Sequence, residues 1–145
     1  MKNIKIILAV GAILFIAALL YSGLSKKERA NQTESRVDSK IQINDEGGVS
    51  VEVELIGFDP KEPVRFQITF NTHQGDLNFD LTKISFLVDD NGKEYPPLEW
   101  QGGSGGHHLS GVLVFPVLSG NQKMIKLIMR DIYGINKREF KWDLK

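Results

Sequence analysis

Cysteine is absent from this chain of 145 residues. Its absence excludes a disulfide framework, a thiolate metal site and a lipid-modified N-terminal cysteine. The stability of a domain outside the cell must then come from its hydrophobic core alone. Histidine is also scarce, and all three of its residues fall in segments that are expected to be loops.

Net charge is also missing, because 18 Lys and Arg balance 18 Asp and Glu. The balance hides an asymmetry: residues 1–40 hold seven basic and three acidic side chains, and residues 41–145 hold eleven and fifteen. The first segment therefore carries a charge of +4 and the second a charge of −4. A mildly acidic domain is a poor partner for a polyanion, so no binding of nucleic acid is expected.

Long apolar runs are confined to the N-terminus, where residues 6–24 follow the short basic lead MKNIK. These 19 uncharged residues are just enough to span a bilayer as a helix. A cleaved signal peptide has a similar basic start but usually a shorter apolar stretch, and Gly23-Leu24-Ser25 fits its cleavage site only in part. Residues 1–24 are therefore interpreted as a membrane anchor helix or a signal peptide, with the anchor favoured. The membrane is the first expected partner.

Residues 25–40 have mixed charge and almost no large apolar side chain, which indicates a flexible linker. Lysine and arginine are divided almost evenly between the two flanks of the apolar run, so charge does not decide its orientation. The very short N-terminal tail resembles a signal anchor. We therefore expect the domain of residues 41–145 to lie outside the cytoplasm, either as part of a single-pass membrane protein or secreted after cleavage.

Apolar and polar residues alternate along most of this domain, a pattern typical of half-buried strands. Seven strands are expected, at residues 49–55, 64–70, 84–88, 94–100, 112–117, 124–129 and 138–144. Asn91-Gly92 indicates a hairpin between the third and the fourth, because both turn positions tolerate positive φ. Seven short strands with frequent turn signals predict an all-β domain, an immunoglobulin-like antiparallel β-sandwich. Trp100 and Trp142 are expected to pack in its core or at an edge rather than to form ligand platforms.

The histidines lie in two of the expected loops. His73 follows the second strand, and His107 and His108 close the glycine-rich stretch QGGSGGHH between the fourth and the fifth. Each connection in an antiparallel sandwich reverses the chain, so both loops are expected at the same end, together with the turn at residues 134–136. An additional strand at residues 77–81, which also alternate, would separate them.

Aspartates accompany the first histidine loop, and imidazole and carboxylate from separate loops are suitable ligands for Zn²⁺ or Cu²⁺. Neighbouring residues in an extended segment point in opposite directions, so only one histidine of the adjacent pair would bind a given ion. The expected ligands are His73, either His107 or His108, and either Asp76 or Asp80. The alternative is that the histidines donate hydrogen bonds that hold the glycine-rich loop, and it is favoured because the spacing matches no tight motif such as HExxH.

Residues 102–106 (GGSGG) formally match the G-x-S-x-G motif of a nucleophile elbow. That motif needs a preceding strand and a following helix within a much larger α/β sheet, whereas a strand is expected to follow here. No nucleophile–base pair is recognisable elsewhere in the sequence, so the protein is not expected to be an enzyme.

Two short signatures carry a resemblance to other proteins. Asn-Thr-His occupies residues 71–73, and Gly-Gly-His-His occupies residues 105–108, ahead of Gly111-Val112-Leu113 and Phe115. The chain resembles a group of uncharacterised exported prokaryotic proteins that carry these signatures on a β-rich domain, and the resemblance covers residues 49–144. It implies that the histidine loops belong to the family pattern, and it brings no activity with it.

The sequence thus predicts a membrane-tethered or secreted extracytoplasmic module that binds or interacts without catalysis of its own, with another envelope protein as its expected partner. The alternative is a metal-binding domain that uses the histidine cluster with zinc or copper. Ligand and partner identity, oligomeric state and signal cleavage are left open.

Overall fold

The computed structural model describes residues 40–118 and 121–144. The predicted anchor or signal helix at residues 1–24 lies outside the described residues, as does all but the last residue of the predicted linker at residues 25–40. Within the part of the chain that the structure describes, no helix is long and apolar enough to cross a membrane.

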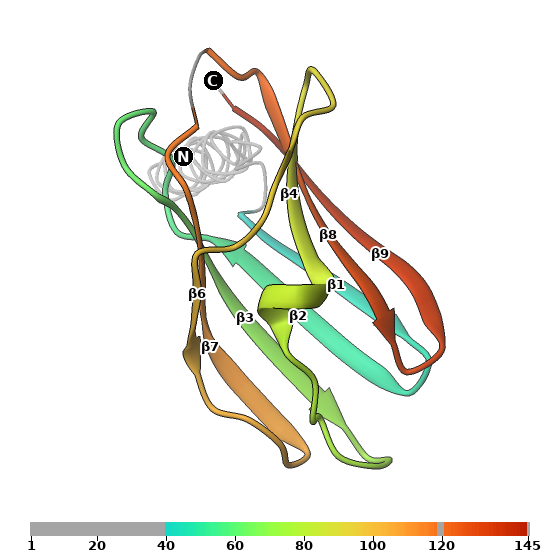
Figure 1. The fold of residues 1–145 in the computed structure, drawn as a ribbon. Helices are drawn as coiled ribbons and strands as arrows, with labels where there is room; N and C mark the ends of the chain where they lie inside the picture. Colours follow the sequence, from blue (N-terminus) through green and yellow to red (C-terminus); the bar gives the residue numbers. More distant parts are fainter. Residues whose placement is uncertain (1–39, 119–120, 145) are drawn as a thin grey trace, which may run out of the picture. The chain divides into compact units, whose positions relative to one another are not determined.

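The described domain consists of strands in two antiparallel sheets and one short helix (Figure 1). In chain order, the elements are β1 (Ile41–Glu46), β2 (Val49–Leu55), β3 (Val64–Thr72), α2 (Leu81–Ile84), β4 (Ser85–Asp89), β5 (Glu94–Tyr95), β6 (Glu99–Gly102), β7 (His108–Phe115), β8 (Met124–Ile132) and β9 (Ile135–Asp143). One sheet has the order β1-β2-β3-β7-β6 and the other the order β5-β4-β8-β9. The predicted all-β domain of antiparallel strands is confirmed.

The alternating sequence forms these strands because one face of each strand is buried while the other contacts water. In β3, Val64, Phe66, Ile68 and Phe70 are buried, and the residues between them are more exposed. The valines of β2 are buried in the same way. Full burial of one such apolar side chain stabilises the fold by about 1.5–3 kcal/mol, so the inner faces of the two sheets form the core.

Both tryptophans pack as predicted. Trp142 is buried, and its ring lies 5.0 Å from that of Phe66, which in turn contacts Phe115 edge to face. Trp100 lies on the edge strand β6 and is half-buried against the core. The first tryptophan thus belongs to the core and the second to an edge.

The domain has one strand, β1, that precedes the first of the seven predicted strands. Its outward-facing Ile43 is 65% exposed, whereas its half-buried side chains are polar. Gln42 accepts the Lys141 N–H at 3.0 Å, and Asn44 accepts a hydrogen bond from the buried Arg138. Polar groups replace apolar ones on the inner side of this strand, so its apolar residues do not mark the buried face.

The predicted fourth strand, at residues 94–100, is two strands in different sheets. Glu94–Tyr95 pairs with β4, and Glu99–Gly102 pairs with β7 in the other sheet. Pro96 and Pro97 separate them, and proline cannot donate a hydrogen bond to a ladder. The chain therefore changes sheet at the proline pair.

Residues 77–81 do not form an additional strand. Leu77 and Leu81 are buried as the chain passes from β3 to β4, and the segment ends in the single turn of α2. Asp80 is the N-cap of this turn and accepts the Thr82 N–H at 3.0 Å. The connection between β3 and β4 therefore adds no strand, and the loop of His73 is not sent to the opposite end from the loop of His107.

Asp89 organises the hairpin between β4 and β5 from a buried position. Its carboxylate accepts the N–H groups of Asn91 and Lys93, both at 2.9 Å, and the Tyr95 hydroxyl at 3.0 Å. Burial alone would raise its pKa, but the hydrogen bonds from Lys93, Tyr95 and Asn91 outweigh burial. The pKa of Asp89 consequently lies below its ordinary value.

Acidification is expected to destabilise the wild-type protein more than the Asp89→Asn variant. The folded-state pKa lies below the ordinary value of 3.8, so the contribution of this carboxylate to stability is complete above that value and is lost as the pH falls through the folded-state pKa. An amide does not titrate in this range. Urea denaturation at about pH 7 and at about pH 2.5 measures the difference, with the exposed Asp90→Asn as the control. Equal losses of stability in wild type and Asp89→Asn would contradict the prediction.

Candidate binding site at the histidine loops

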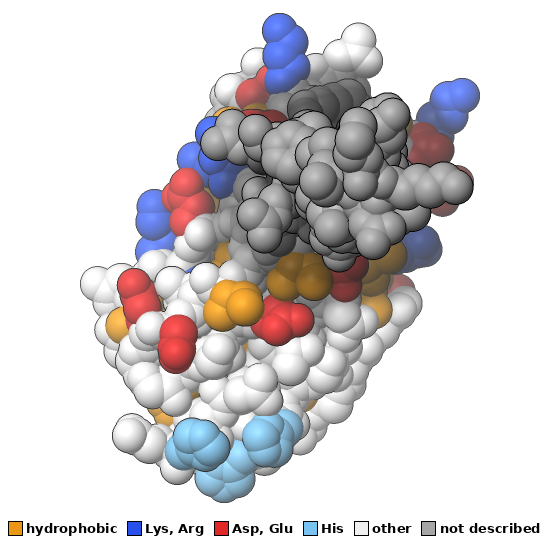
Figure 2. All heavy atoms as spheres, turned by 180° about the vertical axis from the view of Figure 1, so that it is seen from behind, with side chains coloured by type: hydrophobic (Ala, Val, Ile, Leu, Met, Phe, Trp, Pro, Cys, Tyr) orange, Lys and Arg blue, Asp and Glu red, His pale blue; other side chains and the backbone are white. Residues whose placement is uncertain are grey.

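The two histidine loops, residues 73–80 and 103–107, lie at the same end of the domain. His108, which was expected in the second loop, is instead the first residue of β7, because it pairs with Asn71 of β3. β3 ends at Thr72 and β7 begins at His108, and the two strands are antiparallel neighbours with Asn71 opposite His108. Figure 2 shows the histidine side chains gathered at one end. The prediction that both loops share an end is therefore confirmed.

The β8–β9 turn lies at this end as well. A Cβ atom added to Gly75 in the first loop would lie 2.6 Å from the Tyr133 hydroxyl oxygen. Tyr133 and Gly134 both have positive φ, which suits a two-residue hairpin turn. The turn therefore lies at the predicted end of the domain, but it is formed by Tyr133 and Gly134 rather than by residues 134–136, because β9 already begins at Ile135.

Hydrogen bonds join the Asn-Thr-His segment to the Gly-Gly-His-His segment. The Asn71 side-chain oxygen lies 2.7 Å from His108 Nδ1, and the Thr72 N–H donates to the His107 carbonyl at 3.0 Å. The buried Thr72 hydroxyl also accepts the Gln74 N–H at 3.0 Å, which fixes the start of the first loop. Residues of both signatures therefore serve to hold the two loops together.

The glycine-rich loop is held to the first loop along its length. Leu77 donates to the Gly106 carbonyl at 2.9 Å and accepts the Gly105 N–H at 3.1 Å. The Asp76 carboxylate accepts the Gly106 N–H. Both glycines have positive φ, a conformation that other residues adopt only with strain. The two loops thus form one hydrogen-bonded unit.

These contacts occupy the aspartates that were predicted as metal ligands. Asp76 binds Gly106, and Asp80 caps α2 and pairs with Lys83 at 3.0 Å. The hydrogen bonds from Thr82 and Lys83 lower the pKa of Asp80. Within residues 40–118 and 121–144, no three His, Asp or Glu side chains are grouped so that they could hold a metal ion. The ligand set of His73, His107 or His108 with Asp76 or Asp80 stays a prediction.

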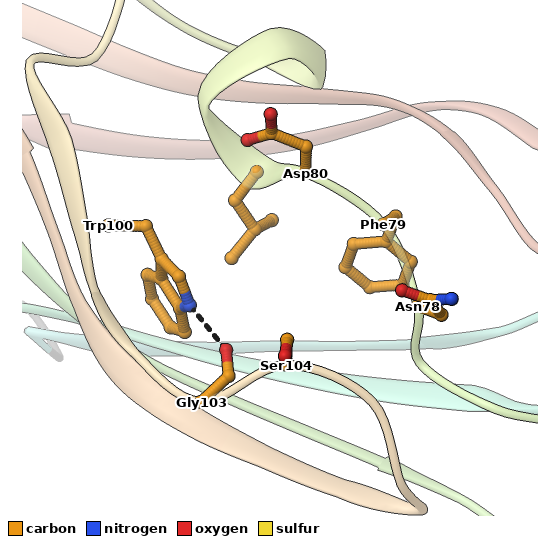
Figure 3. Close-up of a pocket in the computed structure, with 7 residues that line it drawn as sticks. Asn78, Phe79, Asp80, Trp100, Gly103 and Ser104 are labelled. Atoms are coloured by element: carbon orange, nitrogen blue, oxygen red, sulfur yellow. Dashed lines mark hydrogen bonds between the residues drawn. The ribbon is translucent and has the colours of Figure 1, made fainter.

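A pocket of about 300 Å³ opens beside the joined loops. It is lined by Asn78, Phe79, Asp80, Leu81, Trp100, Gly103 and Ser104. Trp100 and Phe79 lie on opposite sides of it, and Asp80 and Ser104 lie at its polar margins (Figure 3). Residues of both histidine loops and of β6 thus build a single cavity.

The Trp100 indole is fixed in place by its own strand and by β7. A Cβ atom on Gly102 would lie 2.4 Å from Trp100 Cζ2, and one on Gly111 would lie 2.8 Å from Cη2, so the ring fills the space left by these glycines. The indole N–H donates to the Gly103 carbonyl at 2.8 Å (Figure 3). The wall of the pocket that Trp100 forms therefore has a fixed position in the absence of a ligand.

The sequence pointed to Asp80 in this region, but as a metal ligand, and gave no sign of Asn78 or Phe79. Trp100 was expected only to pack, and Ser104 was considered only in the dismissed G-x-S-x-G match. The available signal was the pair Gly102 and Gly111, because glycine in a strand often marks a close approach by another group. That signal becomes specific only when the register places both glycines opposite each other, next to Trp100.

No family model matches the chain, and comparisons with curated proteins and with solved structures gave no match. The similarity to exported prokaryotic β-domain proteins therefore stays a prediction from the two signatures.

Proposed function

We propose that the domain is an extracytoplasmic binding module, tethered to the membrane by its N-terminal segment or secreted, that holds a ligand in the pocket beside the histidine loops. The observation that carries the proposal is a cavity with walls that are fixed in advance. The Trp100 indole is held by two glycines and a hydrogen bond, and the loops on the other side are joined to each other. A preformed site loses less conformational freedom on binding, which increases affinity.

The topology that we propose for the module is immunoglobulin-like. Support comes from the strand orders β2-β3-β7-β6 and β5-β4-β8-β9, which follow the ABED and C′CFG sheets of that architecture, with β1 added at one edge. Such domains place their loops at the two ends of the sandwich, and variable domains bind antigen with the loops of one end. The histidine loops occupy one of these ends.

Binding without catalysis is proposed because the pocket lining lacks paired catalytic groups. Asp80 is its one carboxylate and Ser104 its one hydroxyl, and none of the lining residues is a histidine or a lysine. A serine nucleophile needs a neighbouring base, and general acid–base chemistry needs a group free to exchange its proton. The Asp80 carboxylate is already engaged by Thr82 and Lys83.

The test uses the full chain, purified in a detergent without a sugar headgroup, and saturation-transfer NMR against small methyl glycosides, dipeptides and nucleosides. We expect at least one class to receive saturation from the wild type and to lose it with Trp100→Ala. Gln101→Ala is the matched control, because Gln101 is the next residue on β6 and does not line the pocket. Failure of every class to bind, or binding that Trp100→Ala leaves unchanged, would refute the proposal.

A further inference from the structure

We infer that the pocket binds a neutral sugar ring, such as one hexopyranose unit of a glycan. The inference rests on the proposed binding function and names its ligand class. It follows from three properties of the lining: the aromatic surfaces, the kind of polar groups between them, and the absence of a basic side chain among the lining residues.

The aromatic surfaces favour a ligand with a flat array of C–H groups. The indole N–H of Trp100 is already bonded to Gly103, and one side of the ring covers the glycines. What the ring offers to a ligand is therefore its π surface, which is electrically negative and attracts weakly positive C–H hydrogens. Phe79 presents a second ring across the cavity. A pyranose whose hydroxyls are mostly equatorial has such a C–H surface on at least one face of its ring.

The polar groups suit hydroxyls. Asn78 can donate and accept, Ser104 can do both through one hydroxyl, and the Asp80 carboxylate accepts. Asp80 Oδ1 already accepts both the Thr82 N–H and the Thr82 hydroxyl, and Oδ2 pairs with Lys83. Of the about four acceptor positions of a carboxylate, one on Oδ2 is left for a ligand hydroxyl. Neighbouring sugar hydroxyls need both donors and acceptors at short spacing, and a hydrogen bond to a carboxylate is stronger than one between neutral groups.

Charge argues against anionic ligands. None of the residues that line the pocket is basic, so a phosphate or a carboxylate on the ligand would meet Asp80 without a compensating cation in the lining. The Lys83 side chain is 80% exposed and is directed to Asp80. Nucleotides and acidic peptides are therefore disfavoured relative to an uncharged polyhydroxylated ring.

Size sets how much of a glycan can enter. A volume of about 300 Å³ lies at the lower end of the range for small-molecule sites. Such a cavity takes one ring, and the rest of a longer chain would remain outside. Cleavage of the glycan is not expected, because glycoside hydrolysis usually requires two carboxyl groups that flank the bond and this lining has one.

The deciding experiment measures dissociation constants of the full chain for methyl glycosides of neutral hexoses and N-acetylhexosamines, with an alanine dipeptide and adenosine as competing classes. It uses saturation-transfer NMR in the same sugar-free detergent. We expect a glycoside to bind, with the strongest saturation on its ring C–H protons, and Trp100→Ala to weaken binding about tenfold or more. Gln101→Ala should bind like the wild type.

Asp80→Asn provides a second variant that keeps the fold, since asparagine is as good an N-cap as aspartate. We expect it to weaken glycoside binding about fivefold, because a charged acceptor is replaced by a neutral one. Binding of the dipeptide or of adenosine in a Trp100-dependent manner, with no glycoside bound, would overturn the sugar assignment and leave the binding function in place. Absence of binding by every class would overturn both.

Discussion

Replacing Arg138 with alanine is expected to lower the free energy of unfolding by about 3–5 kcal/mol. This side chain lies on the inner face of β9 and is only 1% exposed. Its guanidinium donates to the Asn44 side chain, to the Glu46 carbonyl at 2.8 Å and to the Val49 carbonyl at 3.3 Å. These hydrogen bonds connect the β1–β2 hairpin of one sheet to β9 of the other.

The expected loss has two sources. Truncation leaves the carbonyls of Glu46 and Val49 and the amide of Asn44 without this donor, and only the contact with Val49 is fully buried. A buried acceptor left unsatisfied costs about 1–3 kcal/mol, and the two partly buried acceptors cost less. Truncation also leaves a cavity where the aliphatic part of Arg138 was packed. Burial lowers the pKa of Arg138, and the charges of Glu46 and Asp45 oppose that effect, so the side chain keeps its charge at neutral pH.

Urea denaturation followed by tryptophan fluorescence measures this loss, and two variants isolate its cause. Arg138→Met keeps most of the volume but no donor, so it should recover only the part of the loss that comes from packing. Lys137→Ala removes the neighbouring charge, which forms an exposed ion pair with Glu139 at 3.0 Å, and should cost less than about 1 kcal/mol. A stability of Arg138→Ala equal to that of Lys137→Ala would show that the buried guanidinium does not join the sheets.

Arg138 also illustrates why part of the fold could not be read from the sequence. The apolar alternation of β2 and β3 predicts both their location and their buried face, because every second residue of a half-buried strand is apolar and faces the core. Arg138 occupies an inward position as a charged residue, and its partners are 89 to 94 positions away in the sequence. Such a contact depends on which strands meet, and no local pattern contains that information.

The candidate site could also be predicted from the sequence only in part. Counting chain reversals predicts that the loops of His73 and of His107 and His108 share an end, because antiparallel connections alternate. The direction of each side chain does not follow from counting. Asp76 turns to the backbone of Gly106, and His108 turns to Asn71, so residues that suited a metal by type are engaged in holding the loops.

The pocket depends on two segments that are distant in sequence, residues 78–81 and 100–104. Its lining comes from residues 78–81, from Trp100 and from residues 103–104. The proline pair that moves the chain between sheets sets where β6 begins, and the register of β6 with β7 sets Gly102 opposite Gly111. The site therefore becomes visible only once strand order and register are known.

Replacing Gly111 with alanine is expected to lower the free energy of unfolding by about 3 kcal/mol and to abolish ligand binding in the pocket. The added Cβ would lie 2.6 Å from both the Gln101 carbonyl oxygen and the Gly102 Cα, and 2.8 Å from Trp100 Cη2. Two of these atoms belong to the backbone of β6, so no rotation of a side chain relieves the overlap. The edge strand has to move away from β7, and the indole moves with it.

Gly103→Ala is the matched control, because the atom nearest to its added Cβ would be Leu109 Cδ1 at 3.7 Å, an ordinary contact. Denaturation in urea measures the two stabilities, and the emission maximum of Trp100, recorded in a Trp142→Phe background, reports exposure of the indole. We expect a red shift and loss of binding for Gly111→Ala, and no red shift for Gly103→Ala. Because Gly103 lines the pocket, Gln101→Ala is the control for binding. Two equally stable variants with equal emission would mean that β6 can shift without cost, and the pocket wall would then not be fixed before the ligand arrives.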